Sequence, residues 1–433
     1  MIDLNLLRHD PDGLKRSLER RGEDPAVVDE ARQTDEQRRA LALEGDTLRE
    51  QRNAASKAIG ALMRGSAPSE TDRARLEEMR EEVRRVGERI GAVEQEHATA
   101  NARLRELLLT IANPPQDDVP DGGDESDNVI VREVGERSAF DFEPKEHWAL
   151  AESLGLVDME RGAKLSGSRF YVLGEQGARL QRALVSYMLD LHRRDHGYRE
   201  MGVPLLVRPE VMEGSGQLPK FADNLYHDDE DDLWLIPTAE VPLANLHRDE
   251  ILPPGALPIR YMAHTHCFRR EKAAAGRDTR GIKRVHQFEK VELFHFTTPE
   301  DSGAALDALL SHAEAVCSGL ELPYRVQEHC TGDLPFQVCK SYDIDVWAPA
   351  SQEWLEVSSC SNCGDFQARR ANIRFRREQG ARPEFVHTLN GSGLALPRIV
   401  IALIESGQRT DGSVRLPDAL VPYMGQAALT PAV

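Results

Sequence analysis

The sequence predicts an α+β protein, in which an antiparallel β-sheet is flanked by helices and preceded by an antiparallel pair of long helices. Two patterns lead to this prediction. Near the N-terminus, apolar residues recur at alternating spacings of three and four, as in coiled coils. Beyond residue 128, short alternating segments are interspersed with amphipathic helices, and this mixed order indicates an α+β sheet. A chain of 433 residues with 40% hydrophobic content can bury a large core and form two or three domains.

The N-terminal region predicts a short helix from Asp10 to Arg21, followed by two long helices. The second long helix keeps a heptad seam to its end, through Leu76, Met79, Val83, Val86, Ile90, Val93, His97, Ala100, Leu104, Leu107 and Ile111. The first has the same period at Leu41, Leu48, Ala55, Ile59 and Leu62, interrupted at Arg38, Gly45 and Arg52. Between them, Gly65 can end a helix and Pro68 prevents its continuation. Ser66 or Ser69 can cap the next helix. We therefore predict that residues 1–113 form an arm whose long helices fold back as an antiparallel coiled coil.

The character of the chain changes after this arm. Asn113, Pro114 and Pro115 end it, and residues 114–127 form an acidic linker that is rich in glycine and proline. We expect residues 128–433 to form the second domain. Its predicted strands are Asn128 to Glu133, Leu233 to Pro237, Tyr342 to Trp347 and Glu353 to Ser359, and its predicted amphipathic helices begin at Gly177 and span about Ala304 to Gly319.

Composition limits the classes of function. A formal net charge of −19 argues against general nucleic-acid binding, although an acidic body can carry a basic arm. The six cysteines are sparse and scattered, which argues against a disulfide framework and fits a reducing cytosol. The N-terminus has no secretion signal, and no apolar run approaches the length of a membrane span. We therefore expect a cytoplasmic protein without a membrane partner.

The stretch from His264 to Phe296 carries most of the chemistry. Its ends alternate apolar and polar residues, and its middle, Ala273 to Gly281, is small and basic, which predicts an antiparallel hairpin with a long loop. Its charged residues include Arg269, Glu271, Arg277, Arg280 and Arg284. Several guanidinium groups around a few carboxylates suit bidentate phosphate binding. An edge hairpin protected by charges would also account for them.

Three segments of this stretch, F-R-R-E, G-R-D-T-R-G and R-V-H-Q-F-E-K-V-E, closely resemble motif 2 of the class II aminoacyl-tRNA synthetases in its seryl form. The resemblance implies that Arg269 binds the α-phosphate of ATP, that Glu271 meets the adenine edge and that Phe288 stacks on the adenine. It also implies that Glu292 helps to hold the amino acid. The loop departs from the commoner small residues of the family at Arg270, Lys272 and Ala274, and these departures affect its detailed contacts.

The segment L-N-G-S-G-L-A-L-P-R, Leu389 to Arg398, opens an apolar helix from Ile399 to Ile404. Taken alone, G-S-G before a helix is a capped turn, and Leu396 stands where a dinucleotide-binding pattern needs its third glycine. The segment resembles motif 3, which implies that Arg398 contacts the γ-phosphate. Pro397 replaces the usual glycine, and this change is mild at a helix start because proline fixes φ near the helical value.

The segment G-Y-R-E-M-G-V-P-L-L-V-R-P, Gly197 to Pro209, follows the helix that begins at Gly177. It resembles motif 1, which implies that the protein is a homodimer through this segment. Without the resemblance, the helix would be an ordinary core helix and dimerisation would have no support beyond its general frequency.

Glu356 and Ser359 lie three residues apart within Trp354 to Arg370 and offer oxygen donors suited to Mg²⁺. The resemblance implies that both bind magnesium together with ATP. Cys360-x-x-Cys363 permits a zinc hypothesis, but no second C-x-x-C or paired histidine motif completes four ligands. We therefore expect no zinc.

The resemblance also assigns the other site residues. The ATP site comprises Arg269, Arg270, Glu271, Val285, Phe288, Glu356, Val357, Ser358, Ser359 and Arg398. Within it, Arg269 and Arg398 are the catalytic residues. The serine site comprises Thr238, Ala239, Glu240, Glu292 and Ser392. The polar groups of Thr238 to Pro242, T-A-E-V-P, suit a small hydroxylated amino acid and would discriminate against alanine, which leaves them unpaired.

The resemblance covers essentially the whole chain and implies the function of the seryl-tRNA synthetases. Serine and ATP would form seryl-adenylate and pyrophosphate, and serine would then pass to tRNA(Ser), with tRNA(Sec) as a second acceptor. The carboxylate of serine attacks the phosphorus itself, so the reaction needs position and positive charge rather than an enzymic nucleophile. The chain indeed has neither G-x-S-x-G nor G-x-x-x-x-G-K-[ST].

Taken alone, a coiled coil is a spacer or a dimerisation device. In seryl-tRNA synthetases a helical arm of this length binds the long variable arm of the tRNA, and basic residues toward the tip of this arm are Arg49, Arg52, Lys57, Arg64, Arg73, Arg75, Arg80, Arg84 and Arg85. Two other functions stay open. A non-translational relative could load an amino acid onto a carrier protein or a natural product, although such ligases typically lack the arm. A catalytically inactive interaction protein would be expected to lose residues such as Arg269, Glu356 or Arg398, which are present.

Overall fold

The computed structural model describes residues 1–64, 69–272 and 280–431. The chain forms two compact units. The helical unit consists of Asp3–Glu19 and Asp24–Ile111, and the sheet unit consists of Met1–Ile2, Arg20–Glu23 and Ala112–Val433.

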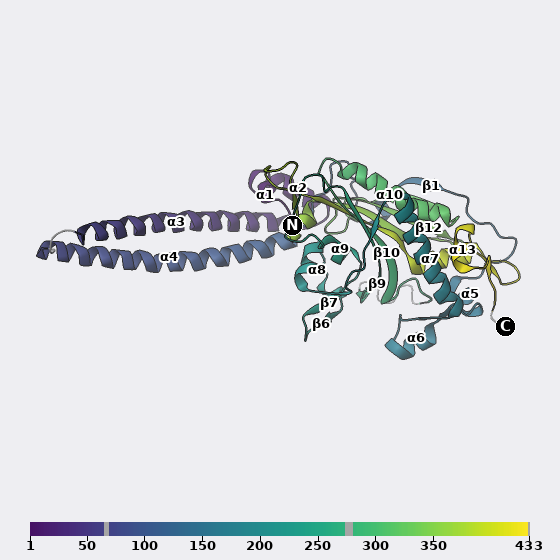
Figure 1. Ribbon diagram of the computed structural model, residues 1–433. Helices are drawn as coiled ribbons and strands as arrows, with labels where there is room; N and C mark the ends of the chain where they lie inside the picture. Colours follow the sequence, from purple (N-terminus) through teal and green to yellow (C-terminus); the bar gives the residue numbers. More distant parts are fainter. Residues whose placement is uncertain (65–68, 273–279, 432–433) are drawn as a thin grey trace. The chain divides into compact units, whose positions relative to one another are not determined.

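The helical unit contains α1 (Leu4–His9), α2 (Pro11–Arg20), α3 (Ala26–Leu62) and α4 (Glu70–Thr110). The helices α3 and α4 lie side by side and run in opposite directions, so the predicted helical hairpin is confirmed (Figure 1). Along their seam, Leu41, Val93 and Ala100 form a buried cluster on which Leu48 packs. Ser69 begins α4 with a capping box that it shares with Asp72, as predicted. The predicted turn residues Gly65, Ser66 and Pro68 lie outside the described residues.

The sheet unit is built on an eight-stranded sheet in the order β1-β11-β12-β13-β16-β10-β9-β4. These strands are β1 (Val129–Val134), β11 (Tyr324–Glu328), β12 (Lys340–Ala348), β13 (Glu353–Gly364), β16 (His387–Ala395), β10 (Gln287–Thr297), β9 (Ile259–Phe268) and β4 (Arg199–Glu200). Neighbours are antiparallel except for β4, which runs parallel to β9. The predicted α+β class is therefore confirmed, and the predicted hairpin is the pair β9 and β10.

Helices cover both faces of this sheet because alternate residues of β10 face opposite sides. Val291 and Leu293 belong to the core shared with α7 (Glu175–Asp195), α10 (Ser302–Gly319) and α12 (Leu396–Ser406). Phe294 and Phe296 belong to a second core, shared with α9 (Glu240–Ala244) and α11 (Phe366–Ala371). The helices predicted to begin at Gly177 and to span about Ala304 to Gly319 correspond to α7 and α10. Pro397 lies in the first turn of α12, where a proline is tolerated.

The remaining elements are short. The helices are α5 (His147–Ser153), α6 (Met159–Ser166), α8 (Pro209–Ser215) and α13 (Val421–Met424), with 3₁₀ turns η1 (Glu125–Asp127), η2 (Ala222–Asn224) and η4 (Asp418–Leu420). Small sheets pair β5 (Leu206–Val207), β7 (Leu233–Leu235) and β6 (His227–Asp228); β15 (Glu384–Phe385), β14 (Arg374–Phe375) and β8 (Ile251–Leu252); β2 (Val157–Asp158) and β3 (Val172–Leu173); and β17 (Val414–Arg415) and β18 (Ala428–Leu429).

The segment Arg20–Glu23 belongs to the sheet unit because of one buried arginine. The guanidinium of Arg21 donates to the backbone carbonyls of Asn113, Leu334, Pro335 and Val338 at 2.7–3.0 Å. The side chain of Asn113 in turn donates to the carbonyls of Gln337 and Cys363, both at 2.9 Å. These bonds attach the chain around residue 113 to the sheet.

Three further observations concern the cysteines, metal sites and membrane spans. All six cysteines are free and buried. The described residues contain no group of three or more histidine, cysteine or acidic side chains that could hold a metal ion. None of the helices in the described ranges is both long and apolar enough to cross a membrane.

Candidate active site

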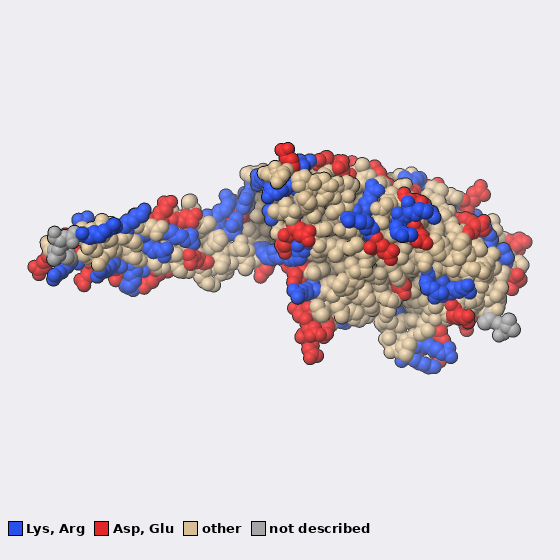
Figure 2. All heavy atoms as spheres, viewed as in Figure 1, with Lys and Arg blue, Asp and Glu red and all other residues tan. Residues whose placement is uncertain are grey.

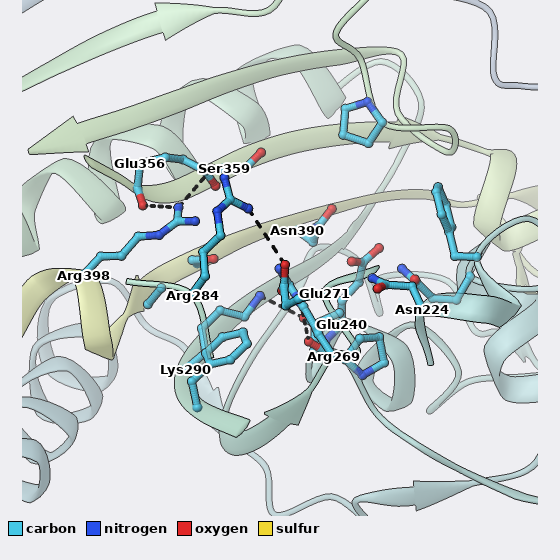
Figure 3. Close-up of a pocket in the computed structure, with 18 of the residues that line it drawn as sticks. Asn224, Glu240, Arg269, Glu271, Arg284, Lys290, Glu356, Ser359, Asn390 and Arg398 are labelled. Atoms are coloured by element: carbon cyan, nitrogen blue, oxygen red, sulfur yellow. Dashed lines mark hydrogen bonds and ion pairs between the residues drawn. The ribbon is translucent and has the colours of Figure 1, made fainter. Parts of the chain in front are cut away.

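A cavity of about 440 Å³ opens on the face of the sheet that α9 and α11 cover. Its walls come from the segment before α9, the hairpin β9–β10, strand β13, and the junction of β16 with α12, with further lining from residues 217–225 and 335–338. The described lining residues from these parts include Thr238, Glu240, Arg269, Glu271, Val285, Phe288, Lys290, Glu356, Val357, Ser359, Asn390, Ser392 and Arg398 (Figure 3). The structure therefore brings together most of the site residues predicted from motif 2, motif 3 and the segments Thr238 to Pro242 and Trp354 to Arg370.

Strand alternation explains how the hairpin contributes to the cavity. Phe288, Lys290 and Glu292 are alternate residues of β10, so their side chains leave the same face of the strand. Glu292 lies opposite Ser392 on β16, where the register of the two strands shifts. This bulge brings motif 3 beside motif 2 at the floor of the cavity.

One end of the cavity holds a compact polar group. The hydroxyl of Thr238 donates to Glu292 Oε2 at 2.8 Å and accepts from Lys290 Nζ at 2.9 Å. Lys290 also forms an ion pair with Glu292. Glu292 is fully buried beneath these two side chains and is absent from the described lining of the cavity.

Glu240 stands on the wall of the same end. Its carboxylate accepts from the side chain of Gln367 at 2.7 Å and from that of Gln337 at 3.5 Å. Burial above all, and then the charge of Glu292, raise the pKa of Glu240 to about 7, while Lys290 acts in the opposite direction. Glu240 can therefore change its charge near neutral pH.

The other end of the cavity is lined by arginines. The guanidinium of Arg269 lies 5.1 Å from the ring centre of Phe288 and donates through Nε to the carbonyl of Pro237 at 3.3 Å. It forms no ion pair with a carboxylate of the described residues, so it can meet an anionic ligand. Arg284 lies 3.9 Å from the carboxylate of Glu271.

Arg398 and Glu356 form the opposite wall of this end. Arg398 Nη1 donates to the backbone carbonyl of Glu356 at 2.6 Å and to its carboxylate at 3.1 Å. Desolvation would raise the pKa of Glu356, but the charge and hydrogen bond of Arg398, together with the charges of Arg269 and His329, lower the pKa overall. Ser359 lies on the same strand as Glu356, with its hydroxyl 3.2 Å from that of Ser341.

A second cavity of about 730 Å³ adjoins the first and shares Glu356, Ser359 and Arg398 with it. Its own lining includes His329 and Asp343. Although burial lowers the pKa of His329, the carboxylates of Asp343 and Asp333 more than offset this and raise it to about 9. A protonated imidazole therefore lies beyond the arginine end of the first cavity.

Some predicted residues lie elsewhere. Arg270 donates to the carbonyl of Leu225 at 2.7 Å and lies over the ring of Tyr226, and it is absent from the described lining of the cavity. Ala239 and Ser358 are buried behind the wall, where the Ser358 hydroxyl contacts the carbonyl of Ser392 at 2.8 Å. Ala274 and Arg277 of the motif 2 loop lie outside the described residues.

Several groups at the cavity were not among the residues predicted from the sequence. Lys290, Gln337 and Asn390 line it, and Gln367 contacts Glu240 behind the wall. Lys290 could have been found, because it shares a strand face with Phe288 and Glu292. Gln337 and Gln367 carry no comparable signal, since they come from separate parts of the chain.

Basic residues of the helical unit form ion pairs on its surface. Arg49 contacts Asp46 at 2.8 Å and Glu94 at 2.9 Å, and Arg84 contacts Glu88 at 2.7 Å. Figure 2 shows basic and acidic side chains intermixed along α3 and α4. These ion pairs are exposed, so each contributes little to stability and can open when a stronger anion binds.

Comparison with known proteins agrees with this geometry. Residues 1–115 match the seryl-tRNA synthetase N-terminal domain, and residues 221–407 match the tRNA synthetase class II core domain (G, H, P, S and T). The serine–tRNA ligase of Thermomicrobium roseum is 57% identical over 425 residues, which are 98% of this chain and 94% of that protein.

Two solved structures extend the likeness to the fold. The seryl-tRNA synthetase of Pyrococcus horikoshii, complexed with ATP, has a TM-score of 0.93 and 38% identity, and the match covers 100% of both chains. The cytoplasmic serine–tRNA ligase of Naegleria fowleri, in complex with AMP, has a TM-score of 0.87 and 31% identity and covers 100% of this chain and 99% of its own. The chain therefore belongs to the seryl-tRNA synthetase family of class II aminoacyl-tRNA synthetases.

Proposed function

We propose that the protein is a cytoplasmic serine–tRNA ligase, which activates L-serine with ATP and transfers the serine to tRNA. The observation that carries this proposal is the division of the cavity into two ends. Arg269 and Arg398 line one end, and Glu240 and Lys290 line the other. An anionic nucleotide and a small cationic amino group fit such a division side by side.

The arginine end would hold ATP. Arg269 binds the α-phosphate and Arg398 the γ-phosphate, while Phe288 stacks on the adenine and Glu271 meets its edge. Val285 and Val357 line this part of the cavity. The carboxylate of serine attacks the α-phosphorus, a new phosphorus–oxygen bond forms, and the bond to the departing pyrophosphate breaks. The arginines stabilise the charge that develops on the phosphate oxygens.

The metal would be a Mg²⁺ ion held by Glu356 and Ser359. Both side chains line the cavity beside Arg398 and offer the oxygen donors that Mg²⁺ prefers. The ion would neutralise charge on the ATP phosphates. Glu356 would then be shared between the ion and Arg398.

The other end would hold serine. Glu240 offers a carboxylate to the ammonium group, and Ser392 adds a hydroxyl to the wall. Thr238, Ala239 and Glu292 shape the floor and the buried layer behind it. A polar floor of this kind rejects alanine because its groups would be left unpaired.

The helical unit would bind the tRNA, with tRNA(Ser) as the main acceptor and tRNA(Sec) as a second one. The exposed arginines of α3 and α4 would contact backbone phosphates, which position an RNA without reading its bases. The motif 1 segment Gly197 to Pro209 would join two chains into a homodimer.

Two assays on one pair of proteins test this function. The full chain should show serine-dependent exchange of pyrophosphate into ATP and should charge tRNA(Ser). A variant that lacks Arg49–Ile90, with Leu48 joined to Gly91 by a short Gly-Ser turn, keeps the apolar cluster around Val93. It should retain the exchange and lose the charging. Equal charging by both proteins would refute the role of the helices, and absence of serine-dependent exchange in the full chain would refute the enzyme assignment.

A further inference from the structure

The second cavity, of about 730 Å³, has no role in the proposed function. It adjoins the first cavity at Glu356, Ser359 and Arg398, which line both (Figure 3). The register of β12 and β13 explains this border. Asp345 lies opposite Glu356, and Asp343 lies opposite Ser359. Neighbouring strands are about 4.8 Å apart, so a ligand passes from one cavity to the other by a short movement over the sheet.

The wall of the second cavity contains two buried polar atoms without hydrogen-bond partners. The residues that carry them, His329 and Asp343, are 5% and 8% exposed. His329 Nε2 lies 2.9 Å from Asp343 Oδ1, but their alignment does not make a hydrogen bond. Neither atom has another hydrogen-bond partner among the described residues. Because buried polar groups are normally hydrogen-bonded, this pair at a cavity wall indicates a place for a ligand.

The imidazole of His329 is held in one orientation. Its Nδ1 donates to the backbone carbonyl of Asp333 at 3.3 Å. Because the ring is charged, Nε2 carries a hydrogen as well, and no described residue accepts it in a good geometry. His329 therefore offers one charge-assisted donor to the second cavity, and donors of this kind form strong hydrogen bonds with phosphate oxygens.

The other charged groups of the second cavity favour an anion that carries a divalent cation. Arg325 donates to Asp345 at 2.9 Å, so this pair adds little net charge. The carboxylates of Asp343 and Glu356 also line the cavity. They would repel a bare polyanion, whereas an anion bound to Mg²⁺ presents charge of both signs.

The proposed reaction releases such an anion at the border of the two cavities. The β- and γ-phosphates of ATP leave together as pyrophosphate, and Arg398, which would bind the γ-phosphate, belongs to both cavities. Serine would occupy the other end of the first cavity, at Glu240. The leaving group therefore departs on the side of the second cavity.

We propose that the second cavity receives magnesium pyrophosphate after its bond to the α-phosphorus has broken, and that His329 Nε2 donates a hydrogen bond to one of its oxygens. Asp333 and Asp343 are positioning residues that hold the imidazole in place. The inference rests on the proposed function, because ATP in the first cavity is the source of the pyrophosphate.

The test is His329→Leu in the full chain, which removes the donor. Calorimetry with pyrophosphate and Mg²⁺ should give a dissociation constant about tenfold higher than that of the wild type, as expected for losing a hydrogen bond to a charged group. In pyrophosphate exchange, the KM for pyrophosphate should rise by a similar factor while the KM for ATP stays within about twofold. His329→Gln keeps an N–H donor and should weaken pyrophosphate binding less than His329→Leu does.

His227→Leu is the matched control. His227 also pairs with two carboxylates, those of Asp229 and Asp232, and it is absent from the described lining of both cavities. Its replacement should leave the binding of pyrophosphate and of ATP unchanged.

Two results would overturn the inference. Equal weakening of pyrophosphate and ATP would mean that His329 acts on the first cavity, and unchanged pyrophosphate binding would mean that the second cavity does not receive this product. If His329→Leu does not fold because Asp343 has lost its counter-charge, the double variant His329→Leu, Asp343→Val removes both charges and should show the same selective loss. A wild-type protein without serine-dependent exchange would instead refute the proposed function.

Discussion

Buried carboxylates are paired differently in the helical unit and in the active-site cavity. In the helical unit, Asp35 is 1% exposed and is surrounded by arginines. Arg8 donates to it at 2.7 and 2.9 Å, Arg38 at 2.9 Å and Arg39 at 3.0 Å. These partners, Arg8 above all, lower the pKa of Asp35 to about 2.

In the cavity, Lys290 pairs with Glu292 and acts on Glu240 only through its charge. Glu240 accepts from two amides and has its pKa raised to about 7 by burial, and Glu292 has one oxygen without a partner among the described residues. Nearby, Arg269 forms no ion pair with a described carboxylate. A charge that only supports folding is fully paired, whereas a charge kept for a ligand is left partly unpaired at a cost in stability.

The largest expected effect comes from removing the unpaired cation. Arg269→Ala should lower serine-dependent pyrophosphate exchange by about a hundredfold or more, because a charge-assisted phosphate contact that strengthens in the transition state is worth roughly 3 kcal/mol. Arg161→Ala, at an exposed arginine paired with Asp158, is the control. Near-wild-type exchange by the Arg269 variant would show that this arginine is not reserved for a phosphate.

Replacing Asp35, the fully paired carboxylate, should lower stability rather than activity. Asp35→Asn leaves several arginines without their counter-charge and should lower the free energy of unfolding by about 3 kcal/mol, measured from helical circular dichroism in urea. Asp46→Asn, at an exposed partner of Arg49, should change it by less than about 1 kcal/mol.

The pH dependence of this stability has a definite sign. Because the folded-state pKa of Asp35 is lowered from 3.8 to about 2, its contribution is present above about pH 4 and is lost as the pH falls through 2. The difference in stability between the wild type and Asp35→Asn should therefore shrink in acid, and a difference as large below about pH 2 as at neutral pH would contradict this account.

An intermediate effect is expected at Glu356, which is paired with Arg398 and faces the cavity. Glu356→Gln should raise the Mg²⁺ concentration that gives half-maximal exchange by roughly tenfold, because a carboxylate ligand becomes a neutral one. A Mg²⁺ titration of the exchange rate measures this, with Glu160→Gln on the exposed surface of α6 as the control. An unchanged requirement would place the ion elsewhere.

The smallest expected effect is on the pH dependence of serine binding. Glu240 faces Glu292, Lys290 and the Cys363 thiol, and with its pKa near 7 it is half ionised at neutral pH. The ionised form attracts the ammonium group of serine, so the KM for serine should fall a few-fold between about pH 6 and 8. Glu240→Gln should remove this dependence, and a pH-independent wild-type KM would show that Glu240 does not meet the ammonium group.

The same raised pKa affects the ligand-free protein. The ordinary value is 4.5, so between about pH 4.5 and 7 the folded state holds a proton that the unfolded state has lost. The contribution of Glu240 to the free energy of unfolding therefore falls as the pH rises through that window. The contribution of Asp35 changes with pH in the opposite direction.

The sequence alone was enough to predict the helical hairpin, the α+β class and most of the residues around the cavity. Heptad spacing is a local property, so Leu41, Val93 and Ala100 could be placed on one seam without a structure. Motifs 2 and 3 are long, and each supplies part of the cavity wall from a single stretch of chain, as do Thr238 to Pro242 and Trp354 to Arg370. Their resemblance to one family therefore located the site even though the motifs are separated in sequence.

Tertiary structure decided which way individual groups point and which of them are paired. Arg269 and Arg270 are neighbours in sequence, yet only Arg269 lines the cavity, because Arg270 turns to the carbonyl of Leu225. Lys290 and Glu292 share a strand face, yet the lysine covers the carboxylate. Hydrogen-bond direction and burial depend on groups that meet only after the chain has folded, and these decide whether a charge is saturated or left for a ligand.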